Sequence, residues 1–197
     1  GYSGSNINNS YATGNIETNG GQAVGGLAAY QAFGSVLNSY ASGNLTGTNT
    51  VMVGGLIALY LSGQGSISNS HASGNIKSTN SMYLGGFLAD MASGEITNSY
   101  ANGNINSENS QYIGGFIAYG AGTITNSYET GNIYAKTSLS NYPPLNAGGF
   151  IGTNMIDIRN SYASGNVSEI STSSNASNLG GFVGTNNDTI TDAYALG

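Results

Sequence analysis

Cysteine, tryptophan and charged residues are absent or scarce in this sequence. Its 197 residues include no Cys, no Trp, two Pro and only 6% charged residues. Without Cys there is no thiol chemistry. The three cations are Lys77, Lys136 and Arg159 against nine carboxylates, so no basic face exists to bind nucleic-acid phosphates. No apolar run approaches the ~18–20 residues that span a bilayer, which predicts no membrane insertion.

What the chain does contain argues against disorder. Hydrophobic residues make up 39% of it and 32 residues are Gly, whereas disordered chains combine low hydrophobicity with high net charge. The sequence begins at Gly1 rather than Met, so we expect either a processed subunit or a piece of a longer protein.

A repeat of roughly 30 residues runs through the chain, and it is carried by an Asn-Ser-aromatic anchor. Successive anchors are 29, 31, 29, 28, 34 and 32 positions apart. The anchors are Tyr11, Tyr40, His71, Tyr100, Tyr128, Tyr162 and Tyr194. Asn or Asp stands two residues before each anchor, and an aliphatic residue such as Ile7 stands two residues earlier again. This alternation predicts a strand with one buried face.

Two glycine motifs divide each repeat further. A Gly-Asn pair, first at Gly14-Asn15, follows the anchor, and a Gly-Gly pair, first at Gly25-Gly26, begins another apolar stretch. Gly and Asn both tolerate positive φ, so the Gly-Asn pair predicts a corner. We therefore expect an all-β chain in which residues 1–197 form a single parallel β-solenoid domain. It should have about seven coils of 28–34 residues with three short strands each.

Stacking of identical coils predicts ladders of identical side chains inside the solenoid. Buried Asn amides would hydrogen-bond from coil to coil, and Tyr rings would stack. The residues expected in this structural ladder are Asn9, Asn38, Asn69, Asn98, Asn126, Asn160, Tyr11, Tyr40, Tyr100, Tyr128 and Tyr162. Glycine pairs are expected where a side chain would collide with the next coil.

The repeat resembles the GLUG motif of bacterial surface proteins. The resemblance rests on Gly-Gly-Phe-Ile-Gly-Thr-Asn at 148–154, its near copy at 180–186, and the segment 158–167. The family includes filamentous-haemagglutinin-like adhesins and the passenger regions of some immunoglobulin A peptidases. The resemblance implies a surface-displayed β-solenoid without catalytic residues. The family often has Cys where this chain has Ser before the Tyr.

No constellation for catalysis, cofactor or metal binding stands out. His71 is the only histidine and occupies the Tyr column, so we expect a structural role for it. The carboxylates are scattered, whereas acid–base pairs and cation cages need several acidic groups that converge. The sequence predicts a protein that is not an enzyme and has no catalytic, cofactor or metal site.

The first functional hypothesis is a structural subunit or segment of an extracellular or cell-surface fibre. Its partner would be another copy, head to tail, or neighbouring repeats of a longer chain. Placing Gly197 before Gly1 recreates a sequence that resembles residues 179–186. The expected interface comprises Gly1, Tyr2, Ile7, Tyr194, Leu196 and Gly197.

The alternative is a surface adhesin or glycan-binding module. From anchor to Gly-Gly, the fifth and sixth repeats are longer than the first four, and the extra residues lie in 136–147 and 169–178. Insertions in adjacent coils predict neighbouring loops, and we take Tyr142, Pro143 and Pro144 as the candidate ligand loop for host or surface glycans. Ice binding is a third hypothesis, but no regular Thr-x-Thr column supports it.

Overall fold

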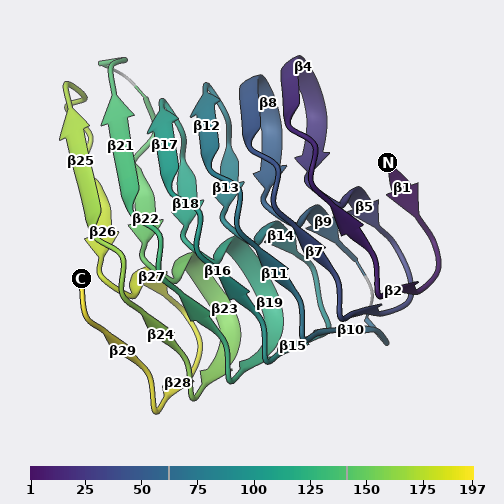
Figure 1. Ribbon diagram of the computed structural model, residues 1–197. Helices are drawn as coiled ribbons and strands as arrows, with labels where there is room; N and C mark the ends of the chain where they lie inside the picture. Colours follow the sequence, from purple (N-terminus) through teal and green to yellow (C-terminus); the bar gives the residue numbers. More distant parts are fainter. Residues whose placement is uncertain (62, 141) are drawn as a thin grey trace.

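The repeats fold into a parallel β-solenoid of about six turns, seen from the side in Figure 1. The structure is a computed structural model that describes residues 1–61, 63–140 and 142–197. It contains strands and no helix within those residues. The two ends of the chain lie at opposite ends of the stack (Figure 1). The predicted fold class, with three strands per coil, is confirmed.

Three parallel sheets form the sides of the solenoid, and we call them sheets A, B and C. Sheet A contains β1 (Tyr2–Ser3), β2 (Ile7–Asn8), β5 (Ala28–Gln31), β6 (Val36–Leu37), β9 (Ile57–Tyr60), β10 (Ser66–Ser68), β14 (Leu88–Met91), β15 (Glu95–Thr97), β19 (Ile117–Thr125), β23 (Ile151–Arg159), β27 (Val183–Asn186) and β28 (Ile190–Thr191). Sheet B contains β3 (Tyr11–Ala12), β7 (Tyr40–Ala41), β11 (His71–Ala72), β16 (Tyr100–Ala101), β20 (Tyr128–Glu129), β24 (Tyr162–Ala163) and β29 (Tyr194–Ala195). Sheet C contains β4 (Ile16–Gly25), β8 (Leu45–Gly54), β12 (Ile76–Thr79), β13 (Tyr83–Gly85), β17 (Ile105–Glu108), β18 (Tyr112–Gly114), β21 (Ile133–Thr137), β22 (Asn146–Gly148), β25 (Val167–Ser171) and β26 (Asn178–Gly180).

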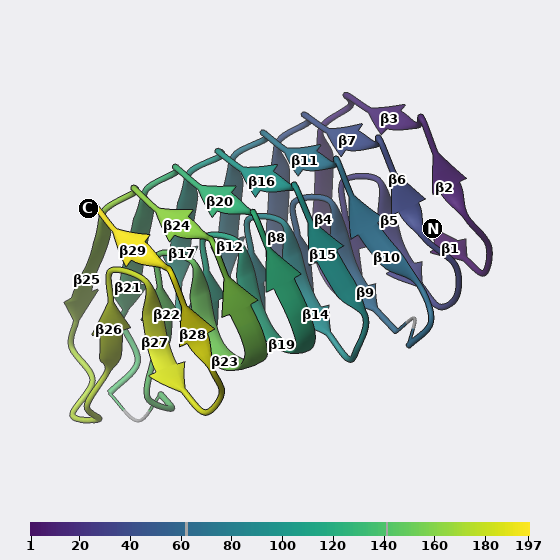
Figure 2. The ribbon, with the colours of Figure 1, turned by 90° about the horizontal axis from the view of Figure 1, so that it is seen from below.

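Equivalent residues of successive repeats pair in register. Ile67 lies between Val36 and Ile96 in sheet A, and all three side chains are fully buried. The Phe rings that follow the Gly-Gly pairs stack through the core, with centroids 4.6 Å apart between Phe87 and Phe116. Because each apolar column is covered only by the turns above and below it, one repeat cannot form this core alone. The seven strands of sheet B lie side by side along the stack (Figure 2).

The Gly-Gly and Gly-Asn positions require glycine because backbones of adjacent turns approach closely there. A Cβ at Gly86 would lie 1.9 Å from the carbonyl oxygen of Gly115. A Cβ at Gly74 would lie equally close, 1.9 Å, to the carbonyl oxygen of Gly43. Neither glycine has a positive φ. The expected collision with the next coil is thus present at both motifs. The predicted corner at the Gly-Asn pair is also present, since Gly14-Asn15 lies between β3 of sheet B and β4 of sheet C, but the corner forms without a positive φ.

The positive-φ corner belongs instead to the Asn that precedes the Ser-aromatic pair. Asn9, Asn38, Asn69, Asn98, Asn126, Asn160 and Asp192 have φ between 49° and 52°. Asn and Asp adopt this left-handed conformation more readily than other residues with a side chain, because their short polar side chains bond locally. The column therefore turns the chain between sheet A and sheet B.

Candidate functional site

The aromatic anchors form a continuous stack on the outer face of sheet B. Neighbouring rings from Tyr11 to Tyr194 lie 4.7–5.3 Å apart between centroids, with planes within 9° of parallel. The prediction of stacked rings is correct, but the prediction that they lie inside is wrong. Tyr11 is 66% exposed, and the internal rings are half-buried. The residue that follows a ring points inward in the internal turns; it is usually Ala, and Ala101, for example, is fully buried.

The Asn9 column is also exposed, so its predicted interior placement is wrong. One amide pair in it is hydrogen-bonded within the described part of the chain, Asn38 Nδ2 donating to Asn9 Oδ1 at 3.2 Å. The physical reason is the left-handed backbone at these Asn residues. It breaks the period-2 alternation, so the aliphatic residue, Asn and Tyr do not share one face.

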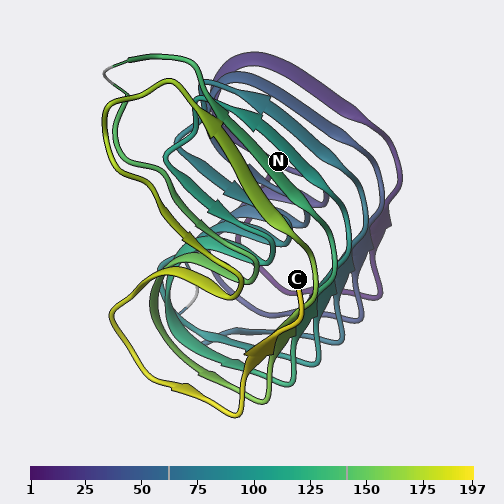
Figure 3. The same ribbon diagram turned by 90° about the vertical axis from the view of Figure 1, so that its left-hand side faces the viewer.

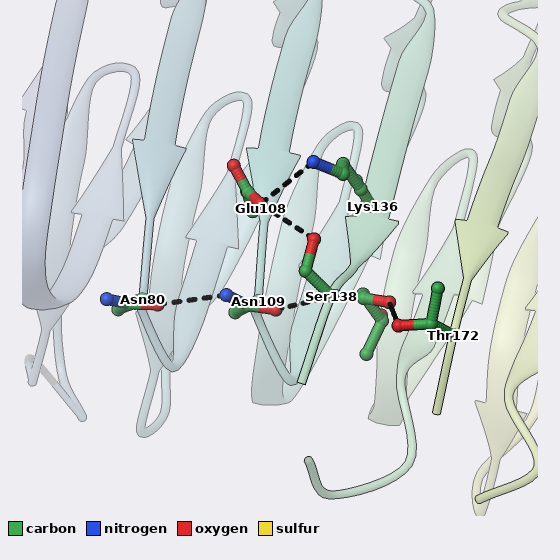
Figure 4. A network of polar contacts seen from close by, with 7 residues as sticks. Asn80, Glu108, Asn109, Lys136, Ser138 and Thr172 are labelled. Atoms are coloured by element: carbon green, nitrogen blue, oxygen red, sulfur yellow. Dashed lines mark hydrogen bonds and ion pairs between the residues drawn. The ribbon is translucent and has the colours of Figure 1, made fainter. Parts of the chain in front are cut away.

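The amide ladder that the sequence predicts is formed by the other Asn column, in the Gly-Asn pairs. Each backbone N–H donates to the Asn Oδ1 of the preceding turn at 2.8–3.0 Å. This ladder comprises Asn15, Asn44, Asn75, Asn104, Asn132 and Asn166. Figure 4 shows part of a third Asn column, in which Asn109 Nδ2 donates to Asn80 Oδ1 at 3.1 Å.

The sequence analysis did not predict a buried ladder of serines, which lies between the Asn9 column and the aromatic stack. From Ser39 to Ser161 the Ser of each Asn-Ser-aromatic anchor is buried, and its Oγ accepts the backbone N–H of the equivalent Ser one turn earlier. The same Oγ donates to the carbonyl two residues before it, as Ser99 does to Thr97 at 2.8 Å. The recurrence of Ser at this position was the available signal, because a small residue that donates and accepts suits a satisfied buried site.

His71 lies within the aromatic stack, as its position in the sequence predicts. Its ring is 4.9 Å from Tyr40 and 4.7 Å from Tyr100, in both cases with planes 3° apart. Burial lowers the pKa of His71 below its usual value of 6.5. No group of three or more His, Asp or Glu side chains that could hold a metal ion occurs among the described residues.

Glu129 is the one position where the inward-facing Ala column of sheet B carries a carboxylate. It pairs in register with Ala101 and Ala163 and is fully buried. The backbone N–H of Gly131 donates to its Oε1, whereas Oε2 has no hydrogen-bond partner among the described residues. Burial raises the pKa of Glu129 to about 8, and the N–H groups of Gly131 and Gly165 partly oppose that rise.

The six residues of the expected end-to-end interface divide between the two ends of the stack. Gly1, Tyr2 and Ile7 lie in or beside the first turn, and Tyr194, Leu196 and Gly197 lie at the last. The predicted match in phase between the ends is wrong, because Tyr2 pairs with Tyr30, whose column ends at Thr185. Tyr2 thus occupies the position of Thr185 rather than of Phe182. The predicted match relied on a short Gly-x-x-Gly similarity that does not reflect the register. The pairing of Ile7 with Val36 is consistent with the observed register.

The two long loops lie side by side at one edge of the solenoid, as the spacing predicts. They join β21 to β22 and β25 to β26, and both project beyond the outline of the other turns in Figure 3. Asn175 Nδ2 donates to the carbonyl of Tyr142 at 2.7 Å. Tyr142 and Pro143 line a shallow hollow of about 380 Å³ together with Asn49, Asn80, Met82 and Gln111. Pro144 is exposed beside it.

The GLUG motif matches residues 20–46, 49–77 and 144–168. No curated protein matches the chain. Within the described residues, no helix has the length and apolar character that a membrane span needs.

Proposed function

This chain is a GLUG-repeat protein, and from that premise we propose that it is a non-catalytic structural segment of an extracellular surface protein. A structural or adhesin-like role fits both the repeat family and the solenoid fold. The extracellular location and the absence of catalysis go beyond this fit and are part of what we propose.

The observation that carries the proposal is the direction of the polar contacts. The Asn, Ser and aromatic ladders all run from turn to turn along the stack, and their polar groups bond to one another. Side chains used in this way stabilise each turn against its neighbours and leave few groups converging on a common point. That arrangement suits a rod whose length and stiffness matter.

The proposal predicts that one turn can be removed without loss of function. Deleting residues 70–98 joins Asn69 to Ser99 and preserves the register, because these boundaries are equivalent in adjacent repeats. The shortened protein should fold, lose about 4.8 Å of length in small-angle scattering and still be labelled by antibody on intact cells. Deleting residues 70–84 removes about half a turn and should abolish folding. The proposal fails if the full-turn deletion folds but loses a specific enzymatic activity.

Growth into a fibre by head-to-tail stacking is a further part of the proposal. Two features of the ends of the stack support head-to-tail stacking. The strand edges there are open, and apolar side chains are exposed, with Tyr2 71% and Leu196 72% exposed. Neighbouring repeats of a longer chain would cover the same edges. If copies stack, light scattering should report growth with concentration, and Asn8→Pro should stop it by disrupting the edge strand. A monomer at all concentrations would exclude self-assembly.

An adhesin role is the second candidate, and the paired loops favour it. They place Tyr142 and Pro143 over a hollow beside two Asn amides, a combination that suits sugars. Removing residues 138–144 should then abolish binding of intact cells to a glycan-coated surface and leave the melting temperature nearly unchanged. Unaltered binding would assign any adhesion to another face.

A further inference from the structure

A second groove lies on the outer face of sheet C, away from the two long loops. It holds about 400 Å³ and runs across four turns. Its floor is the amide ladder of Asn44, Asn75, Asn104 and Asn132, and its wall includes Lys77, Asn106 and Tyr134. Lys77 pairs in register with Asn106, and Asn106 with Tyr134, so the three side chains belong to consecutive turns. We call this surface the amide groove.

Lys77 has no ion-pair partner within the part of the chain that the structure describes. The two ion pairs found there join Lys136 to Glu108 and Arg159 to Asp157. The Glu108 carboxylate is engaged by other residues: its Oε1 accepts from Lys136 Nζ at 3.1 Å and from Ser138 Oγ at 2.7 Å (Figure 4). The carboxylate in the Lys77 column is Glu17, two turns away, or about 10 Å. Lys77 is also exposed, so its ammonium is available to an anion.

The other groups of the groove are suited to a sugar. In the groove, the Oδ1 of each of the four ladder Asn residues accepts an N–H from the next turn. Each amide nitrogen carries two N–H donors and uses at most one of them in a hydrogen bond within the described residues. The ring of Tyr134 is 52% exposed two turns from Lys77, which is about 10 Å. Amide donors and an exposed aromatic ring match the hydroxyl groups and apolar faces of pyranose rings. The lone cation adds a preference for a carboxylate.

We propose that the amide groove binds an acidic oligosaccharide, with Lys77 pairing a uronate carboxylate, Tyr134 stacking on a second sugar ring and Asn106 between them. The site is separate from the loop hollow and goes beyond a structural role for the rod. A linear, carboxylated glycan fits best, because successive turns repeat the amide floor at a constant spacing.

The test compares a galacturonic acid trisaccharide with the neutral galactose trisaccharide by isothermal titration calorimetry. Lys77→Thr places in this column the residue that Thr46 provides one turn earlier, and Tyr134→Ser copies Ser168 one turn later. Each change should weaken binding of the acidic trisaccharide about tenfold or more. Only Lys77→Thr should also abolish the dependence of that affinity on salt.

Arg159→Thr is the matched control, since it removes one cation from sheet A, where Thr191 occupies the same column. It should leave the affinity unchanged, and circular dichroism should show that all three variants fold. The proposal is overturned if the neutral trisaccharide binds equally well or if Arg159→Thr weakens binding as much as Lys77→Thr. It is also overturned if millimolar acetate displaces the trisaccharide, which would leave a simple anion site, or if the acidic trisaccharide does not bind at millimolar concentration.

Discussion

Glu129 should make the stability of the solenoid depend on pH. Its carboxyl is fully buried in a column that otherwise holds Ala, and burial raises its pKa from 4.5 to about 8. The difference corresponds to about 5 kcal/mol at 1.36 kcal/mol per pKa unit. Below pH 4.5 the carboxyl is protonated in both the folded and the unfolded state, so the folded protein carries no penalty.

The sign of the effect follows from which state releases the proton first. Between pH 4.5 and about 8 the unfolded chain is ionised while the folded protein keeps its proton. The free energy of unfolding should therefore fall by about 1.4 kcal/mol per pH unit in this window, which amounts to about 3 kcal/mol at pH 7. Above pH 8 the whole contribution of about 5 kcal/mol is lost.

The assay is urea unfolding of the wild type, Glu129→Gln and Glu129→Ala at pH 5, 7 and 9. Glu129→Gln keeps the shape but cannot ionise, so its advantage over the wild type should grow from pH 5 to pH 9. Glu129→Ala introduces the residue that the neighbouring turns have at this position, and its advantage over the wild type should grow with pH in the same way as that of Glu129→Gln. Glu17→Gln, at an exposed position, is the control and should follow the wild type. Parallel pH profiles for the wild type and both Glu129 variants would refute the reasoning.

Four further changes test the ladders and turns. Gly86→Ala places a Cβ 1.9 Å from the Gly115 carbonyl and should destabilise by about 1–3 kcal/mol, as overpacking does, in a urea titration. Ser99→Ala leaves a buried N–H unsatisfied and should cost about 1–3 kcal/mol in the same assay, and an unchanged midpoint would place this serine in solvent. Asn98→Val should cost about 1–2 kcal/mol because of its left-handed backbone, whereas Asn98→Gly should cost much less. Since burial lowers the pKa of His71, His71→Tyr should raise the melting temperature relative to wild type as the pH falls below 6.5, and should have a smaller effect at pH 7.

The repeat made the stacking of turns predictable, but it did not fix which side of each turn a column occupies. Alternation from Ile96 through Asn98 to Tyr100 indicated one shared face, yet only Ile96 is buried. The left-handed residue at Asn98 changes the direction of the chain between the two strands. A period-2 pattern cannot reveal such a residue, because Asn is common both in ladders and in turns.

The sequence by itself determined that the chain stacks in register as a parallel β-solenoid, because identical residues at a constant spacing can bury their apolar columns only against one another. It also determined where glycine and small residues recur. Only the tertiary structure decided which polar column is buried: Ser99 and its equivalents are buried, whereas Asn98 is exposed and Tyr100 is half-buried. It likewise placed Glu129 in the core and left Lys77, in the wall of the amide groove, without an ion-pair partner among the described residues. These outcomes depend on how the chain turns between sheets and on the neighbours that close packing provides, neither of which a repeat pattern encodes.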